Sequence, residues 1–281
     1  MSTVPARSAA DASTYDPRVA LEFFKAAGKA EEVAAGTTLF AEKEGKGLFK
    51  RSKVYLLLGG EVGLFAGGKT IGSVKPGEIF GELAAISKAP RSATAVAKNA
   101  CKLIALDDKE FQAALRKKPA FALMLMSVMI RRLRETIRAL EAAGALAPET
   151  AAKEAVVFDP KHLAKLLQGL SDEVPVYFDR NKPIMEAGQA GLRMYVVTEG
   201  RVAVKIGDQV VEKLGPGGAF GEAALVEQST RLASAIAETD CTLLPIRRPA
   251  FLALVKMSPG FAESMLGSLA ERLRFLTARI K

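Results

Sequence analysis

The chain is poor in the side chains that build metal sites and disulfide frameworks. Its 281 residues include two cysteines, Cys101 and Cys241, and one histidine, His162. A disulfide framework needs several paired cysteines, and a zinc site needs a cluster of Cys or His ligands. The sequence therefore predicts neither. Each cysteine lies beside an apolar run and is expected in the core. His162 is not expected to act as a ligand or a catalyst.

The chain also lacks a long hydrophobic run and an apolar leader. Its longest nearly continuous apolar stretch, Phe121 to Ile130, has ten residues. A helix that spans a bilayer needs about 20. Residues Met1 to Thr14 are polar and Ala-rich, without the apolar core of a signal peptide. We expect no membrane insertion and a reduced, cytoplasmic protein.

The composition is that of a folded globular protein, with 49% apolar and 25% charged residues. A net charge of +9 suits anionic partners. Charge at this level affects solubility and non-specific binding more than it identifies a partner. Nucleic acid is therefore not favoured on charge alone. The length allows one large domain or two of ordinary size.

One stretch, Lys75 to Ala97, combines residue types suited to a sugar phosphate. Gly81 permits a tight turn, and the residues after it predict the first turn of a short helix, whose free N–H groups can receive a phosphate. Glu82 can accept a hydrogen bond from a ribose hydroxyl. Arg91, nine positions later, offers a planar donor fork to phosphate oxygens. On their own, such a Glu and Arg are more typical of an ordinary surface ion pair.

The same layout occurs twice. Tyr55 to Thr136 aligns without a gap to Tyr195 to Leu276, at a constant offset of 140 residues and with 24 identities in 82 positions. Chance would give roughly five, so the pattern indicates duplication of a whole module. The matched residues include Gly81/Gly221, Glu82/Glu222 and Arg91/Arg231.

Each repeat reads as a set of short strands followed by helices. Regular apolar runs separated by turn residues predict about eight strands in an antiparallel sandwich or barrel. Asp16-Pro17 and Asp159-Pro160 each open a helix, and a long helix is expected from Phe121 to about Ala143. The predicted organisation is a flexible tail (1–15), domain A (16–143), a linker (144–157) and domain B (158–281).

The FGEL…PRSAT block resembles the phosphate-binding cassette of cyclic nucleotide-binding domains, the family of the catabolite activator protein, kinase regulatory subunits and cyclic nucleotide-gated channels. The resemblance implies a mainly β fold with flanking helices. This implied fold would consist of two tandem β-rolls of the double-stranded β-helix, or jelly-roll, type. Each roll would have an N-terminal helix and C-terminal helices. It also implies cAMP or cGMP as ligand, without a metal.

The resemblance assigns roles in the first cassette. Glu82 would bind the ribose 2′-hydroxyl, and Arg91 would pair with the cyclic phosphate. Thr136 would reach toward the base from the long helix. The other positions of this site are Gly81, Leu83, Ala84, Ser92 and Ala93.

The second cassette departs from the family pattern. Its site positions are Gly221, Glu222, Ala223, Ala224, Arg231 and Leu232. Leu232 replaces Ser92, which removes a hydroxyl donor and adds bulk beside the arginine. Ala223 replaces Leu83, Thr230 replaces Pro90, and Leu276 stands where Thr136 is expected to face the base. We expect this site to be weaker, altered in selectivity or empty.

The long helix carries a basic run of Arg131, Arg132, Arg134 and Arg138. It could bind nucleic acid, but in the family such arginines interact with the cassette glutamate and the helix makes dimer contacts. Helix 121–143 is therefore a candidate contact for a homodimer.

Together these features predict a cyclic nucleotide sensor that signals through helix movement and has no catalysis of its own. A transcription regulator of the catabolite activator type would lack its helix-turn-helix here. A kinase regulatory subunit would need an inhibitory basic stretch, whereas only Arg7 precedes Ser8 in the tail. A ligand-free scaffold is disfavoured because Glu82 and Arg91 are both present. The sequence does not separate cAMP, cGMP and cyclic dinucleotides, nor does it identify the downstream protein or the oligomeric state.

Overall fold

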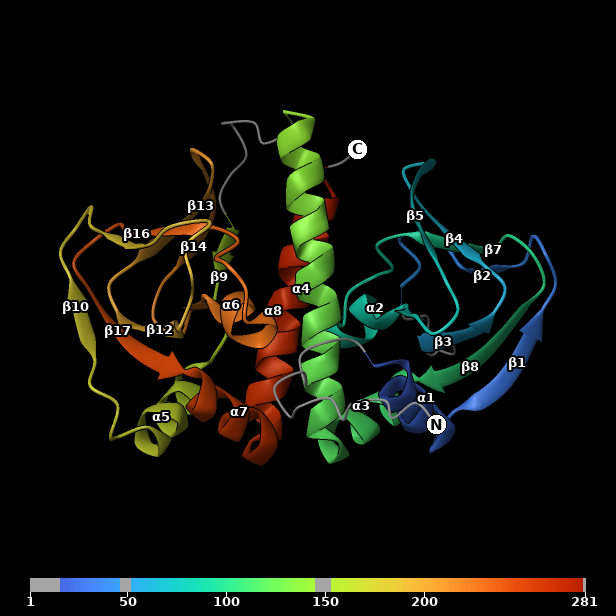
Figure 1. The fold of residues 1–281 in the computed structure, drawn as a ribbon, viewed down its shortest axis with the longest axis horizontal. Helices are drawn as coiled ribbons and strands as arrows, with labels where there is room; N and C mark the ends of the chain where they lie inside the picture. The colour runs from blue at the N-terminus through green and yellow to red at the C-terminus, as the bar shows by residue number, and fades with distance from the viewer. Residues whose placement is uncertain (1–15, 46–51, 145–152, 280–281) are drawn as a thin grey trace, which may run out of the picture. The chain divides into compact units, whose positions relative to one another are not determined.

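The computed structural model describes residues 16–45, 52–144 and 153–279. The expected tail, residues 1–15, lies outside this part of the chain. Two compact units are present, each built on one β-roll (Figure 1). The roll A unit contains Asp16–Ala122, Arg132–Ala147 and Val255–Lys281. The roll B unit contains Leu123–Arg131 and Pro148–Leu254. Each repeat thus has a helical segment that groups with the roll of the other repeat.

Roll A is made of two four-stranded antiparallel sheets. One has the order β1 (Lys29–Val33), β8 (Cys101–Asp107), β3 (Lys53–Gly59), β6 (Ile79–Phe80), and the other β2 (Thr38–Phe40), β7 (Thr94–Ala97), β4 (Val62–Ala66), β5 (Lys69–Val74). Apolar side chains of both sheets form one core, including Tyr55, Leu57, Val62, Phe80 and Leu103. β-branched and aromatic residues favour such half-buried strands.

Roll B repeats this architecture with one extra strand. Its sheets have the orders β10 (Val176–Phe178), β17 (Cys241–Arg247), β12 (Arg193–Glu199), β15 (Ala219–Phe220), and β11 (Pro183–Met185), β16 (Ser234–Ala237), β13 (Val202–Ile206), β14 (Gln209–Leu214), β9 (Lys153–Ala155). The predicted class of two tandem rolls with flanking helices is confirmed. Strand β9 pairs in parallel with β14, so the segment 144–157, expected as a linker, contains a strand.

Two helices begin where the Asp-Pro pairs of the sequence place them. Asp16 caps α1 (Pro17–Lys25), and Asp159 caps α5 (Pro160–Gly169), each followed by proline. The long helix α4 (Pro119–Ala142) begins at Pro119 rather than Phe121, because proline is tolerated at the first helical position. The other helices are α2 (Glu82–Ser87), α3 (Asp108–Lys117), α6 (Glu222–Glu227), α7 (Arg248–Met257) and α8 (Pro259–Thr277).

Four phenylalanines join the helices of the roll A unit. Phe23 of α1 stacks on Phe121 of α4, with ring centroids 3.4 Å apart and an interplanar angle of 7°. Phe24 and Phe111 meet the same Phe121 ring edge-on. All four side chains are fully buried. This cluster holds the start of α4 against α1 and α3.

Both cysteines are buried and unpaired by disulfides, as expected for core residues. In the described ranges, no helix is both long and apolar enough to cross a membrane. Within the same ranges, no three His, Cys, Asp or Glu side chains gather in a group that could hold a metal ion.

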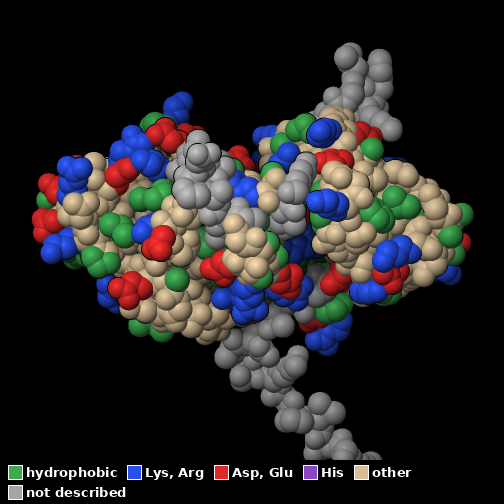
Figure 2. Space-filling model, turned by 90° about the horizontal axis from the view of Figure 1, so that it is seen from above, with side chains coloured by type: hydrophobic (Ala, Val, Ile, Leu, Met, Phe, Trp, Pro, Cys, Tyr) green, Lys and Arg blue, Asp and Glu red, His purple; other side chains and the backbone are tan. Residues whose placement is uncertain are grey.

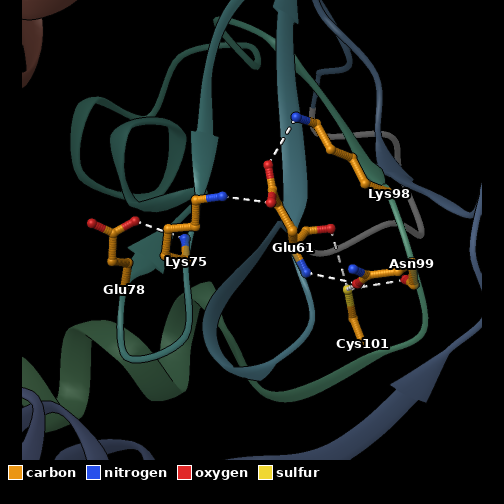
Figure 3. A network of polar contacts seen from close by, with 6 residues as sticks. All are labelled: Glu61, Lys75, Glu78, Lys98, Asn99 and Cys101. Atoms are coloured by element: carbon orange, nitrogen blue, oxygen red, sulfur yellow. Dashed lines mark hydrogen bonds and ion pairs between the residues drawn. The ribbon is translucent and has the colours of Figure 1, made fainter.

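A polar network joins three turns of roll A (Figure 3). The Glu61 carboxylate accepts hydrogen bonds from Lys75 Nζ at 2.5 Å and Lys98 Nζ at 2.8 Å. The backbone N–H of Glu61 donates to Asn99 Oδ1 at 2.8 Å. The two lysines lower the pKa of Glu61 from 4.5 to about 2. The network therefore ties the β3–β4, β5–β6 and β7–β8 connections together.

Replacing Glu61 should give a pH-dependent loss of stability. The lowered pKa means that the carboxylate contributes fully above pH 4.5 and that this contribution disappears as the pH falls toward 2. Glu61→Gln should lower the Tm by roughly 2 °C at pH 7 and by progressively less from pH 4.5 downward. Thermal unfolding from pH 7 to 3 measures this difference.

Glu32→Gln is the matched control, since its partner Lys102 and Glu32 itself are both largely exposed. We expect no measurable change in Tm for this variant. A Tm difference for Glu61→Gln that stayed constant down to pH 3 would contradict the interpretation.

Candidate functional site

Arg91 is a buried cation fixed by backbone carbonyls. Its Nη1 donates to the Gly81 carbonyl and its Nη2 to the Lys53 carbonyl, both at 2.8 Å. The guanidinium also lies over the Phe40 ring, 4.1 Å from its centroid. Gly81 has a φ of +80°, and a Cβ there would lie 2.9 Å from Arg91 Nη1. Glycine is required at this position for both its conformation and its lack of a side chain.

Arg231 repeats this arrangement in roll B. Its Nη1 donates to the Gly221 carbonyl at 2.7 Å and its Nη2 to the Arg193 carbonyl at 2.6 Å. Gly221 has a φ of +84°, and a Cβ there would lie 2.6 Å from Arg231 Nη1. The same glycine–arginine contact is therefore present in both rolls.

Glu82 is the first residue of α2, and its side chain is only 1% exposed. Arg132 of α4 forms an ion pair with it and donates through Nη2 to the Ile79 carbonyl at 2.8 Å. The structure thus brings the cassette glutamate together with an arginine of the long helix. Thr136 is partly buried one turn beyond Arg132, in the same unit.

The remaining residues predicted for the first site lie along the cassette. Leu83 and Ala84 occupy the first turn of α2, where backbone N–H groups have no partner within the helix. Ser92 and Ala93 lead from Arg91 into β7. Ala84 and Ala93 are buried, whereas Leu83 and Ser92 are partly exposed.

The second cassette has the same local layout. Glu222 begins α6 and is 3% exposed, and Ala223 and Ala224 follow it as buried residues. Leu232 is partly buried next to Arg231. Leu276, expected to face the base of this site, lies on α8 and groups with the roll A unit instead.

Sequence comparison missed two residues that contact the arginines. In roll A, Phe40 pairs with Ala95; at the equivalent position of roll B, Met185 pairs with Ala235. Arg231 therefore has no counterpart of Phe40. Instead, a Cβ at Gly191 would lie 2.7 Å from Arg231 Nε. Phe40 and Gly191 both precede the gapless repeat, so the alignment gave no signal for them.

Burial acts on the charged groups of both sites. It lowers the pKa of Arg91, while the nearby Tyr55, Glu44 and Glu82 act in the opposite direction. Burial likewise lowers the pKa of Arg231. Arginine remains protonated at neutral pH in either case. Burial also raises the pKa of Tyr55 to about 12. Each cassette therefore presents a permanent cation beside a helix start, which is suited to a phosphate-sized anion.

Removing Arg132 should destabilise the roll A unit. The buried Glu82 carboxylate would lose its cationic partner, which costs about 3 kcal/mol for Arg132→Ala. Adding Glu82→Gln removes the buried charge, so the double variant should be more stable than the sum of the two single changes predicts. Urea unfolding of all four proteins measures this coupling. Additive effects would contradict a direct Glu82–Arg132 ion pair.

Known proteins resemble this chain in both halves. The model of the cyclic nucleotide-binding domain family matches residues 30–118 and 175–258. A cyclic AMP receptor protein from Thermus thermophilus is 37% identical over 102 residues, 34% of this chain and 47% of the relative. A cAMP-dependent protein kinase regulatory subunit from Mycosarcoma maydis is 30% identical over 210 residues, 70% of this chain and 33% of the relative.

Among solved structures, the regulatory domain of Toxoplasma gondii PKA with cAMP is 22% identical, with 91% of this chain and 95% of that chain covered and a TM-score of 0.31. The chain spans less than half the length of the two curated relatives. The family model, by contrast, covers more than half of the chain, with one match in each repeat. The protein therefore belongs to the cyclic nucleotide-binding domain family.

Proposed function

We propose that the protein is a cyclic nucleotide sensor that binds a 3′,5′-cyclic nucleotide in the first cassette. The observation that carries this proposal is Arg91, a buried cation held by the Gly81 and Lys53 carbonyls beside the start of α2. A cyclic phosphate would receive hydrogen bonds from this guanidinium and from the N–H groups of the first helical turn. Glu82 would accept a hydrogen bond from the ribose 2′-hydroxyl.

The ligand class is cAMP or cGMP. The names of the Thermus relative and of the Toxoplasma structure both include cAMP, which makes cAMP the first ligand to test. Thr136 is proposed to contact the base from α4.

The second cassette is proposed to bind more weakly or not at all. Arg231 keeps its backbone contacts, but Leu232 adds an apolar side chain beside it. Gly191 approaches Arg231 closely, and Met185 replaces the aromatic ring that supports Arg91. Of these changes, the leucine in place of the Ser92 hydroxyl removes a hydrogen-bond donor for a phosphate at this site.

Signalling would begin at the contact between Glu82 and Arg132. A ribose hydroxyl at Glu82 competes for the same carboxylate oxygens, so bound nucleotide would bias the position of α4. Coupling of this kind is typically about 1–3 kcal/mol. The readout would be a downstream protein or a homodimer contact through helix 121–143, in a cytoplasmic regulator without catalysis. The two binding modules would be domains A (16–143) and B (158–281).

A kinase is one candidate partner, because the Mycosarcoma relative is named as a kinase regulatory subunit. Nucleic acid is less favoured. On the face drawn in Figure 2, Lys and Arg side chains are interspersed with Asp and Glu side chains on both units. A nucleic-acid interface typically has a continuous basic patch or stripe, and this face has mixed charge instead.

Calorimetric titration with cAMP and cGMP tests the proposal. Wild type should bind at least one at micromolar concentration, and Arg91→Ala should weaken binding at least about hundredfold. Arg231→Ala is the matched control, since it removes the equivalent contacts from roll B and should leave the strongest binding event unchanged. Thermal unfolding of each variant checks that the roll is intact. Wild type that binds neither nucleotide would overturn the sensor proposal.

The ribose contact can be tested with 2′-deoxy-cAMP. Wild type should bind it about tenfold more weakly than cAMP, because the buried Glu82 oxygen would lose its hydroxyl partner. In Glu82→Gln, the affinities for cAMP and 2′-deoxy-cAMP should be closer to each other. A neutral amide forms a weaker hydrogen bond with the ribose hydroxyl than a carboxylate does. An unchanged ratio between the two ligands in the variant would contradict the role assigned to Glu82.

A further inference from the structure

The first cassette contacts a helix from the second repeat. Helix α8 groups with the roll A unit and packs against α2. From this helix, Arg274 Nη1 donates to the Pro90 carbonyl at 2.5 Å. Pro90 immediately precedes Arg91, so the contact lies one peptide bond from the residue that is proposed to bind the phosphate.

Both polar atoms of the Pro90–Arg91 peptide group are engaged. Arg274 binds its oxygen, and its N–H, which belongs to Arg91, donates to the Glu44 carbonyl at 3.0 Å. The next carbonyl, that of Arg91, accepts from the Lys43 N–H at 2.9 Å. These contacts restrain the peptide planes on both sides of the Arg91 Cα, and hence the direction in which its side chain leaves the backbone.

Helix α8 is fixed well enough to act as this support. Near its start, Glu263 forms an ion pair with Arg116 of α3, with 2.5 Å between Oε1 and Nε. Further along, Leu273 and Leu276 are both 4% exposed. Arg274 lies between these two leucines and is partly buried, while Pro90 is exposed. The hydrogen bond to Pro90 thus extends from a helix that is already packed in the unit.

We propose that Arg274 is a positioning residue for Arg91, and that α8 of the second repeat forms part of the first nucleotide site. This inference rests on the proposed function of that site. If a contact between α8 and the cassette strengthens nucleotide binding, bound nucleotide must strengthen that contact by the same free energy. If Arg274 supports the nucleotide-binding arrangement of Arg91, bound nucleotide stabilises α8 against the cassette. Occupancy of the first site would then be sensed by the terminal helix of the second repeat.

The test combines calorimetry with hydrogen exchange on the full chain, using cAMP and cGMP as probes. Arg274→Ala should weaken binding about fivefold, and Arg274→Lys, which keeps one charged donor, should recover to within about twofold of wild type. Arg279→Ala is the matched control. Arg279 lies two residues beyond the end of α8, and its guanidinium donates to the Phe275 carbonyl and lies over the Phe275 ring. The affinity of Arg279→Ala for cAMP and cGMP should equal that of wild type.

Hydrogen exchange supplies a readout that loss of stability alone would not reproduce. In wild type, nucleotide should slow exchange in peptides covering 259–277 as well as in the cassette. In Arg274→Ala, the cassette should still be protected and the helix should not. If the alanine variant fails to fold, the wild-type exchange data and the lysine variant carry the same test.

The outcomes separate this inference from the proposal on which it rests. Wild type that binds neither nucleotide refutes the proposed function. Wild type that binds, with no added protection in 259–277 and equal affinities for Arg274→Ala and Arg279→Ala, refutes the role of Arg274 and leaves the nucleotide site intact.

Discussion

The site depends on one constraint, the need to satisfy a buried guanidinium. Arg91 is 6% exposed and directs two of its nitrogens at backbone carbonyls, those of Gly81 and Lys53. A buried charge without such partners would be strongly destabilising. These two hydrogen bonds tie Arg91 to the residue before α2 and to the first residue of β3. The lack of a side chain at Gly81 follows from the same contact, because a Cβ there would lie 2.9 Å from Arg91 Nη1.

Local features of the site could be predicted from the sequence for this reason. Gly81, Glu82 and Arg91 lie within eleven residues, so one short helix and the loop after it return the chain from Gly81 to Arg91. The contact of Glu82 with an arginine of the long helix was implied by the family resemblance, and Arg132 makes it. The repeat supported the same prediction a second time, because the glycine and arginine of the cassette recur at the constant offset of 140 residues.

The parts that could not be predicted depend on packing or on backbone atoms. The carbonyls of Lys53 and Arg193 carry no side-chain signal. Phe40 and Gly191 lie before the aligned region, where the two repeats differ in length. The role expected for Leu276 assumed that each terminal helix packs with its own roll, whereas α8 groups with roll A. The linker expected at 144–157 contains β9 because this segment forms a strand by pairing with β14, which carries no local sequence signal.

The second cassette shows why a shared motif does not by itself imply a shared ligand. Arg231 is buried, and its two carbonyl partners satisfy its charge whether or not a nucleotide binds. Gly221 is required by the same contact. Elsewhere the repeats have diverged freely: the pair of Glu61 with Lys98 becomes Arg201 with Glu238, with the charges exchanged. These contacts also stabilise the roll, so the glycine and arginine of roll B are not by themselves evidence of a nucleotide ligand. The capacity to bind is better judged from positions outside these contacts: Ser92 and Thr136 of the first repeat are replaced by Leu232 and Leu276 in the second.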